Sequence, residues 1–285
     1  MKFISNFVRN IHRNVRSNTR VFLVFSILRG LVILALIRHL LLRDYEAVST
    51  CVLALILFIV PSLMENSLRF KIPPLFEAII YLFIFSAEIL GEVNHFYTAI
   101  PQWDTILHSM NGFLAAAVGF SMIDLLNRSH RDIHLSPAYL ALMAFCFSMT
   151  IGVIWEFFEF SMDVWFGHDM QKDTLLTAFN SVAVDPNHSQ RVQHLSDITR
   201  TEIYSADGRI TTVEGGYLDI GLVDTMGDLF VNFLGALTFS VLGFLYVRNR
   251  GDATYVSSRI TSDLLVRSIS DDPRPLMDEE DEPGE

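Results

Sequence analysis

Apolar residues recur along the chain in six long runs, each separated from the next by a more polar segment. An α-helix needs roughly 20 apolar residues to cross the hydrocarbon core of a bilayer. Inside that core a segment must satisfy its own backbone hydrogen bonds, so the runs are expected to be helical. The pattern predicts an all-α, polytopic membrane helix bundle with six transmembrane helices, at Val21–Leu42, Ala47–Met64, Pro74–Glu92, Asp104–Leu126, Pro137–Phe160 and Val223–Val247.

A long polar segment, residues 164–218, separates the fifth run from the sixth. Within it, "TEIYSADGRITTVEG" alternates apolar and polar residues on both sides of Asp207-Gly208. An Asp-Gly pair between alternating segments is a strong short-range signal for a β-hairpin. We therefore expect a small two-stranded hairpin in this loop and no separate domain.

Lys and Arg gather in segments that would share one side of the membrane. These are the N-terminal segment and the segments after the second, fourth and sixth runs, with Lys2, Arg9, Arg13, Arg16, Arg20, Arg69, Lys71, Arg128, Arg131, Arg248 and Arg250. The opposite side is poorer, with Arg38 and Arg43 at the end of the first run. Because basic loops tend to remain cytoplasmic, both termini are predicted to be cytoplasmic and the loop 164–218 to face outward.

The protein is therefore expected in an inner or plasma membrane. Its three expected parts are a basic cytoplasmic tail at 1–20, a six-helix transmembrane domain at 21–248 and a cytoplasmic tail at 249–285. The first run is too long for the apolar region of a signal peptide and has no small-residue cleavage site, so we expect a retained helix. The C-terminal tail ends in "MDEEDEPGE". Such an acidic segment is expected to be disordered.

Composition agrees with a membrane protein, because 51% of the residues are hydrophobic and only 19% are charged. Much of the net charge of −11 comes from the C-terminal tail, so it says little about a substrate. Cys51 and Cys146 fall inside apolar runs, which indicates neither a disulfide nor a thiolate metal site. The sequence contains no nucleic-acid-binding patch, phosphate-binding glycine loop or nucleophilic triad, and we expect no nucleic-acid partner.

Four of the predicted helices carry ionisable side chains at the end that would face outward. The groups are Glu88, Glu92 and His95; Asp104, His108 and Asn111; Glu156, Glu159 and Asp163; and Asp219, Asp224, Asp228 and Asn232. At about 3.6 residues per turn, the spacing within each helix places most of a group on one face. A charged face turned toward lipid would be costly, so these faces are predicted to line one polar cavity.

Carboxylates packed this closely cannot all remain ionised unless some bind protons or a cation neutralises them. Oxygen ligands suit Mg²⁺, Ca²⁺ or Mn²⁺, and imidazole extends the range to Fe²⁺ and Zn²⁺. We expect a divalent metal (Mg, Mn or Zn) with ligands from Glu92, His95, Asp104, His108, Asp163, Asp224 and Asp228. Glu156 and Glu159 are the candidate catalytic carboxylates.

Each group also has a purely structural interpretation. Asp104 beside Trp103 could cap a helix at the membrane interface, and Glu88 could pair with Arg29 or Arg38. The polar residues of the sixth run could join helices by hydrogen bonds, and Gly235 with Ala236 indicates close helix packing. The coincidence of four polar groups on one side favours a real site.

Three motifs give the sequence a family resemblance: "WDTILHSMNGFLAA", "WEFFEFSMDVWFGHDMQKDT" and "GLVDTMGDLFVNFLGAL". Together they resemble the YjdF-like family of inner-membrane proteins, a domain of unknown function, over residues 75–247. The order Asp104-x-x-x-His108, the Glu156 region with Gln171, and Asp228-x-x-x-Asn232-x-x-Gly235 is also similar, more distantly, to the VanZ-like pattern. The resemblance implies which positions matter and leaves the reaction open.

Three classes of function remain open. The first is a metal-dependent enzyme that acts on lipid headgroups or lipid-linked envelope precursors, with Glu156 or Glu159 as general base and Arg29 as a phosphate partner. The second is a membrane protein that binds an ion or ligand without turnover. The third is a cation- or proton-coupled transporter, against which polar residues are scarce in the predicted cytoplasmic half. Membrane lipid is the expected partner in each case.

Overall fold

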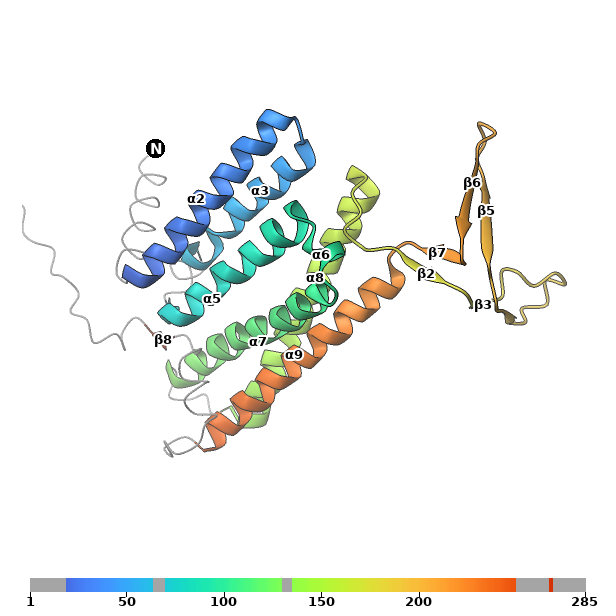
Figure 1. Cartoon of the computed structure of the whole chain (residues 1–285). Coiled ribbons are helices and arrows are strands. Elements are labelled where there is room, and N and C mark those ends of the chain that lie inside the picture. Colours follow the sequence, from blue (N-terminus) through green and yellow to red (C-terminus); the bar gives the residue numbers. More distant parts are fainter. Residues whose placement is uncertain (1–18, 64–69, 130–134, 250–266, 269–285) are drawn as a thin grey trace, which may run out of the picture. The chain divides into compact units, whose positions relative to one another are not determined.

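The structure, a computed structural model, describes residues 19–63, 70–129, 135–249 and 267–268. Its helices are α2 (Thr19–Leu42), α3 (Tyr45–Leu57), α5 (Pro74–Ile84), the π-helix η1 (Phe85–Val93), α6 (Phe96–Ala99), α7 (Trp103–Ser129), α8 (Pro137–Phe166) and α9 (Leu222–Arg248), as Figure 1 shows. The predicted basic tail up to residue 18, most of the predicted acidic tail, Arg69 and Arg131 lie outside the described residues.

Six helical segments are long and apolar enough to cross a membrane: Val21–Leu42, Tyr45–Leu63, Pro74–Val93, Trp103–Asn127, Pro137–Phe166 and Leu222–Arg248. This confirms the predicted membrane helix bundle and the number of spans. Two boundaries differ from the prediction by more than one residue, for local reasons. Asp44 caps α3, because its carboxylate accepts a hydrogen bond from the Ala47 N–H at 3.2 Å, so that helix begins two residues earlier. Helix α8 continues to Phe166 because only Gly167, at φ +69°, ends it.

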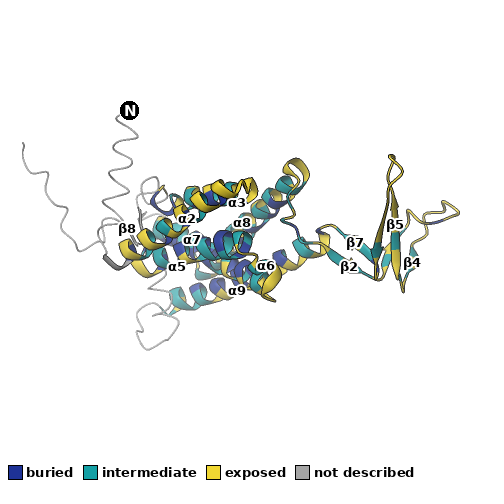
Figure 2. Cartoon of the chain, turned by 45° about the horizontal axis from the view of Figure 1, so that its top comes forward, coloured by how far each residue is buried: buried dark blue, intermediate teal, exposed yellow. Residues whose placement is uncertain are grey.

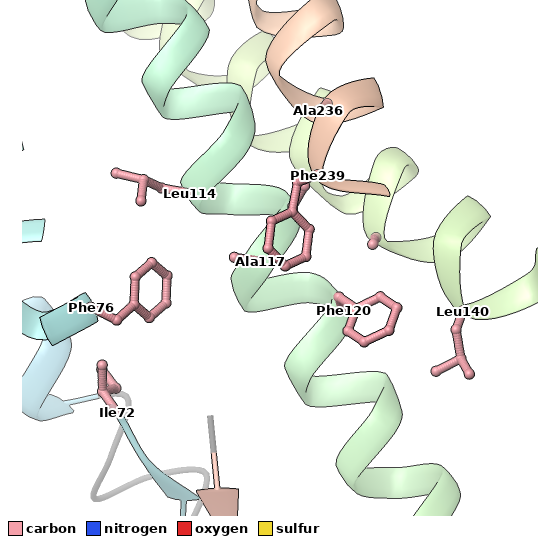
Figure 3. Close-up of a cluster of buried hydrophobic side chains, with 10 residues drawn as sticks. Ile72, Phe76, Leu114, Ala117, Phe120, Leu140, Ala236 and Phe239 are labelled. Carbon is pink, nitrogen blue, oxygen red and sulfur yellow. The ribbon is translucent and has the colours of Figure 1, made fainter. Parts of the chain in front are cut away.

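Most of the helices belong to one compact unit, formed by residues 1–152 and 231–285. One of its two apolar clusters, drawn in Figure 3, joins α5, α7, α8 and α9. Phe120 and Phe239 are fully buried there, with ring centroids 6.0 Å apart. The second cluster joins α2, α3, α5 and η1 around the fully buried Tyr81.

Glycines allow α7 and α9 to approach closely within this unit. A Cβ on Gly112 would lie 2.1 Å from the carbonyl oxygen of Asn232, and a Cβ on Gly235 would lie 2.0 Å from that of Ser109. No side chain fits at either position, so the backbones themselves are in contact. Small residues at such contacts are typical of membrane helices, and the interpretation of Gly235 as a packing position is confirmed.

The second unit, residues 153–230, contains the ends of α8 and α9 and three short antiparallel strand pairs. The pairs are β2 (Thr174–Leu176) with β7 (Tyr217–Asp219), β3 (Phe179–Ser181) with β4 (Gln193–Leu195), and β5 (Arg200–Tyr204) with β6 (Ile210–Glu214). Their residues are exposed or half-buried, as Figure 2 shows. In the unit of residues 1–152 and 231–285, β1 (Phe70–Lys71) pairs with β8 (Arg267–Ser268).

The β5–β6 pair confirms the predicted hairpin. Its turn has Gly208 at φ +87°, and the Gly208 N–H donates to the Ser205 carbonyl at 3.0 Å. A non-glycine residue seldom adopts that backbone conformation, which is why Asp-Gly signalled the turn. The other two pairs were not predicted, because strands of three residues are too short to show an alternating pattern.

Replacing Gly235 by alanine should destabilise the protein, because the new methyl group would force α7 and α9 apart. We expect a loss of about 1–3 kcal/mol, the usual range for overpacking. Gly227 lies on the same helix with no atom within 4 Å of a Cβ, so Gly227→Ala is the matched control and should be neutral. The measurement is denaturant unfolding in detergent. Equal losses in both variants would contradict the close helix contact.

The predicted orientation can be checked at the β5–β6 turn. With Cys51 and Cys146 replaced by serine, a cysteine introduced at Asp207 should react with a membrane-impermeant thiol reagent added outside intact cells. Tags at Met1 and after Glu285 should be reached only after permeabilisation. Labelling of the Asp207 position from the cytoplasmic side would reverse the orientation inferred from the basic residues.

Candidate metal centre

Three buried carboxylates meet within the unit 153–230. Glu156 and Glu159 lie on α8, and Asp228 lies on α9. Each offers a carboxylate oxygen, and these oxygens lie within 4.8 Å of one another. The three residues are only 5%, 7% and 6% exposed. We call Glu156, Glu159 and Asp228 the carboxylate group.

Helical spacing explains how α8 presents two members of this group. Glu156 and Glu159 are three residues apart and therefore share one face, as the sequence predicts. Trp155 holds Glu159 in place, because the indole Nε1–H of Trp155 donates to Glu159 Oε1 at 2.8 Å. The opposite face of α8 is apolar, with Phe157 66% exposed.

Three negative charges at this separation would repel one another strongly. At 4.8 Å and an effective dielectric constant of about 20, each pair of ionised carboxylates is unfavourable by about 3–4 kcal/mol. Carboxylate oxygens only accept hydrogen bonds when ionised, so the group cannot neutralise itself. Either a shared proton or a bound cation would remove the repulsion.

Asp224 extends the acidic face of α9 by one turn. Its carboxylate and that of Asp228 approach within 4.8 Å, so Asp228 lies close to Asp224 as well as to the two glutamates. The backbone N–H of Lys172 donates to Asp224 Oδ2 at 2.7 Å and holds it in place. Asp219 caps the same helix by accepting from the Val223 N–H at 2.8 Å.

Asp163 and Gln171, both candidate residues in the sequence analysis, attach the loop after α8 to the ends of α8 and α9. Both Asp163 oxygens accept backbone hydrogen bonds, from Met170 at 2.6 Å and from Gln171 at 2.9 Å. Gln171, 9% exposed, donates from Nε2 to Thr225 Oγ1 at 2.6 Å. Among the described residues, the groups of close potential ligands do not include Asp163, and its role as a metal ligand stays a prediction.

The loop after α8 is itself acidic. Burial, together with the negative charges of Asp169, Asp163 and Asp219, raises the pKa of Asp173 above its ordinary value. A concentration of negative charge at this end of the unit would attract cations.

Polar residues of α7 form a second set, in the unit of residues 1–152 and 231–285. His108 is 8% exposed, and its Nε2 lies 3.4 Å from Asp104 Oδ1, one turn earlier. Asn111 donates from Nδ2 to Oδ1 of Asn232, at 3.1 Å, and Asn232 is 1% exposed. The structural interpretation of Asn232, as a residue that joins two helices, is therefore confirmed.

The third span departs most from the prediction. Its second half is the π-helix η1, which ends at Val93, and His95 follows in a left-handed conformation at φ 57° and is exposed. Contrary to the prediction, His95 therefore does not continue the helical face of Glu88 and Glu92, because the helix ends before it. Among the described residues, the groups of close potential ligands include neither Glu92 nor His95.

Glu88 is buried in η1 at 3% exposure, whereas Arg29 and Arg38 are exposed. Among the described residues, neither arginine lies within ion-pair distance of Glu88, so that pairing is not formed. The guanidinium of Arg29 lies 5.6 Å from the centroid of the Phe25 ring. Its role as a phosphate partner remains a prediction.

Sequence reasoning missed several buried polar positions, among them Asp124 and His39. Asp124, 3% exposed, lies on α7 after Phe120, so the predicted cytoplasmic half is less apolar than expected. His39 Nδ1 lies 2.9 Å from Asp44 Oδ2, and this hydrogen bond, with one from the Ala47 N–H, lowers the pKa of Asp44. The sequence feature that could have indicated this pair is an Asp at the start of a helix, five residues after a His.

The chain resembles other predicted membrane proteins. A family model described as "Predicted membrane protein (DUF2238)" matches residues 22–249. The chain is also similar to an uncharacterized protein of Thermotoga maritima, with 28% identity over 103 residues, which is 36% of this chain and 52% of that relative. The chain thus matches about half the length of this relative. No solved structure matches the present chain.

Proposed function

We propose that the chain, which belongs to the DUF2238 family of predicted membrane proteins, is a divalent-metal-dependent enzyme that acts on a lipid headgroup or a lipid-linked envelope precursor. The YjdF-like resemblance is confirmed, since that family is the same one. The observation that supports the proposal most directly is the carboxylate group, in which Glu156, Glu159 and Asp228 approach within 4.8 Å in a buried setting.

The spacing of these oxygens fits one cation. Divalent ions bind oxygen ligands at about 2.0–2.6 Å, so two oxygens on the same ion are at most about 5 Å apart. The carboxylate group meets this limit. Carboxylate oxygens are hard ligands, which favour Mg²⁺ or Mn²⁺, and a nitrogen ligand would also admit Zn²⁺.

We keep His108 as the nitrogen ligand predicted from the sequence, because an imidazole beside carboxylates would bring Zn²⁺ into range. Asp104, one turn before His108, is proposed as a further oxygen ligand or as the acceptor that orients the imidazole.

A divalent ion, when bound, polarises an ester or phosphoryl oxygen and makes a water molecule more acidic. The chain must supply a base that takes the proton of that water. We propose Glu159 for this role, because the hydrogen bond from Trp155 fixes one of its oxygens and thereby orients the other. Glu156 and Asp228 then serve as ligands. Their burial excludes bulk water, which strengthens electrostatic interactions within the site.

Removal of single charges should remove the metal. Glu156→Gln and Asp228→Asn keep side-chain size and delete a ligand charge, so purified variants should contain little bound divalent metal by elemental analysis. Phe157→Leu changes an exposed residue of the same helix and should retain it. Equal metal loss in all three variants would indicate general misfolding.

The role of Glu159 can be separated from metal binding. Glu159→Gln should retain metal while turnover falls at least about 100-fold, the usual contribution of a general base. The assay follows headgroup release from a total bacterial lipid extract, by mass spectrometry, with wild-type protein in nanodiscs as reference. Metal without turnover in the wild type would indicate a binding protein. Metal flux into proteoliposomes that Asp224→Asn abolishes would indicate a transporter.

A further inference from the structure

A short segment after α8, residues 167–172, connects the ends of two helices within the unit 153–230, and we call it the strap. It begins at Gly167, whose φ is +69° and whose N–H donates to the Asp163 carbonyl at 3.2 Å. A left-handed glycine of this kind ends a helix and reverses the chain across the helix end. The strap therefore starts as a turn back over α8.

The α8 side of the strap is fixed by a single carboxylate. Asp163 accepts the backbone N–H groups of Met170 and Gln171, at 2.6 and 2.9 Å. Hydrogen bonds from N–H groups to an ionised acceptor are among the stronger ones in proteins. Both oxygens of the carboxylate are thus engaged by consecutive residues of the strap, which fixes the direction of the chain there.

The α9 side is fixed by two further hydrogen bonds. Gln171 donates from Nε2 to Thr225 Oγ1 at 2.6 Å, and the Lys172 N–H donates to Asp224 Oδ2 at 2.7 Å. Gly221, at φ +124°, makes room for the strap, since a Cβ there would lie 2.7 Å from Gln171 Cβ. Gln171 therefore binds α8 through its backbone and α9 through its side chain.

The strap is anchored one helical turn from the carboxylate group. Asp163 follows Glu159 by four residues on α8, and Asp224 precedes Asp228 by four residues on α9. Without a cation, repulsion between the carboxylates would drive these two helix ends apart. Hydrogen bonds through the strap oppose that separation and do not depend on an ion.

We infer that the strap preorganises the carboxylate group for its cation, and that Gln171 and Thr225 are positioning residues that act through it. The inference rests on the proposed function, because it assigns a role in metal binding. A ligand set held in place before binding loses less freedom when the metal arrives. Outer residues that orient ligands typically change metal affinity by about 10–100-fold.

Thr225 offers a matched pair of variants for the test. Thr225→Val removes the hydroxyl at nearly constant shape, and Thr225→Ser keeps it. In Mn²⁺ titrations of the full chain in nanodiscs, followed by electron paramagnetic resonance, Thr225→Val should weaken binding about 10–100-fold without changing the stoichiometry. Thr225→Ser should bind as the wild type does. Gln171→Ala should match Thr225→Val, and combining them should add no further loss, because both remove the same hydrogen bond.

A second measurement examines the metal-free protein. Spin labels on cysteines at Phe166 and Leu222, each 68% exposed, report the distance between the two helix ends, with Cys51 and Cys146 replaced by serine. The distance distribution should be narrow in wild type and Thr225→Ser and broader in Thr225→Val. Wild-type Mn²⁺ affinity and an unchanged distribution in Thr225→Val would overturn the positioning role alone. A wild-type protein without Mn²⁺ binding would overturn the proposed function and the positioning role together.

Discussion

The free-energy cost of a polar group in hydrocarbon is the constraint on which the arrangement of this protein depends. A charged side chain at the centre of a membrane helix is unfavourable by about 2.5–3.5 kcal/mol on insertion scales. Several polar side chains in the described spans accordingly have partners. The Ser148 hydroxyl donates to the Gly112 carbonyl at 2.7 Å, and the Tyr81 hydroxyl donates to Glu77 at 2.9 Å.

Two different solutions to this constraint occur along the helices. Amides and hydroxyls can donate and accept, so Asn111 and Asn232 satisfy each other, and such a pair joins helices without any further component. Ionised carboxylates only accept, so Glu156, Glu159 and Asp228 cannot satisfy one another. A proton or a cation would relieve the repulsion within such a group, whereas the asparagine pair needs neither.

Features with a strong local cause could be predicted from the sequence. Span length and apolar content determine the six membrane helices, and Asp207-Gly208 determines a turn. The shared face of Glu156 and Glu159 followed from α-helical spacing. His95 could not be placed, because no sequence pattern signals the switch from α-helix to π-helix at Phe85. The role of Asp163 could not be predicted either. It depends on how the loop after α8 folds back over the end of that helix.

Helix α9 carries both kinds of polar group, a carboxylate and an asparagine, on successive turns. Near its start, Asp224 accepts from the backbone of Lys172. Two turns later, Asn232 accepts from Asn111, and its carbonyl lies against Gly112 so closely that no side chain would fit. Because the helix is continuous, these contacts determine its axial position and rotation on both sides of Asp228. The position of Asp228 is thereby set through the backbone, by contacts that precede and follow it along α9.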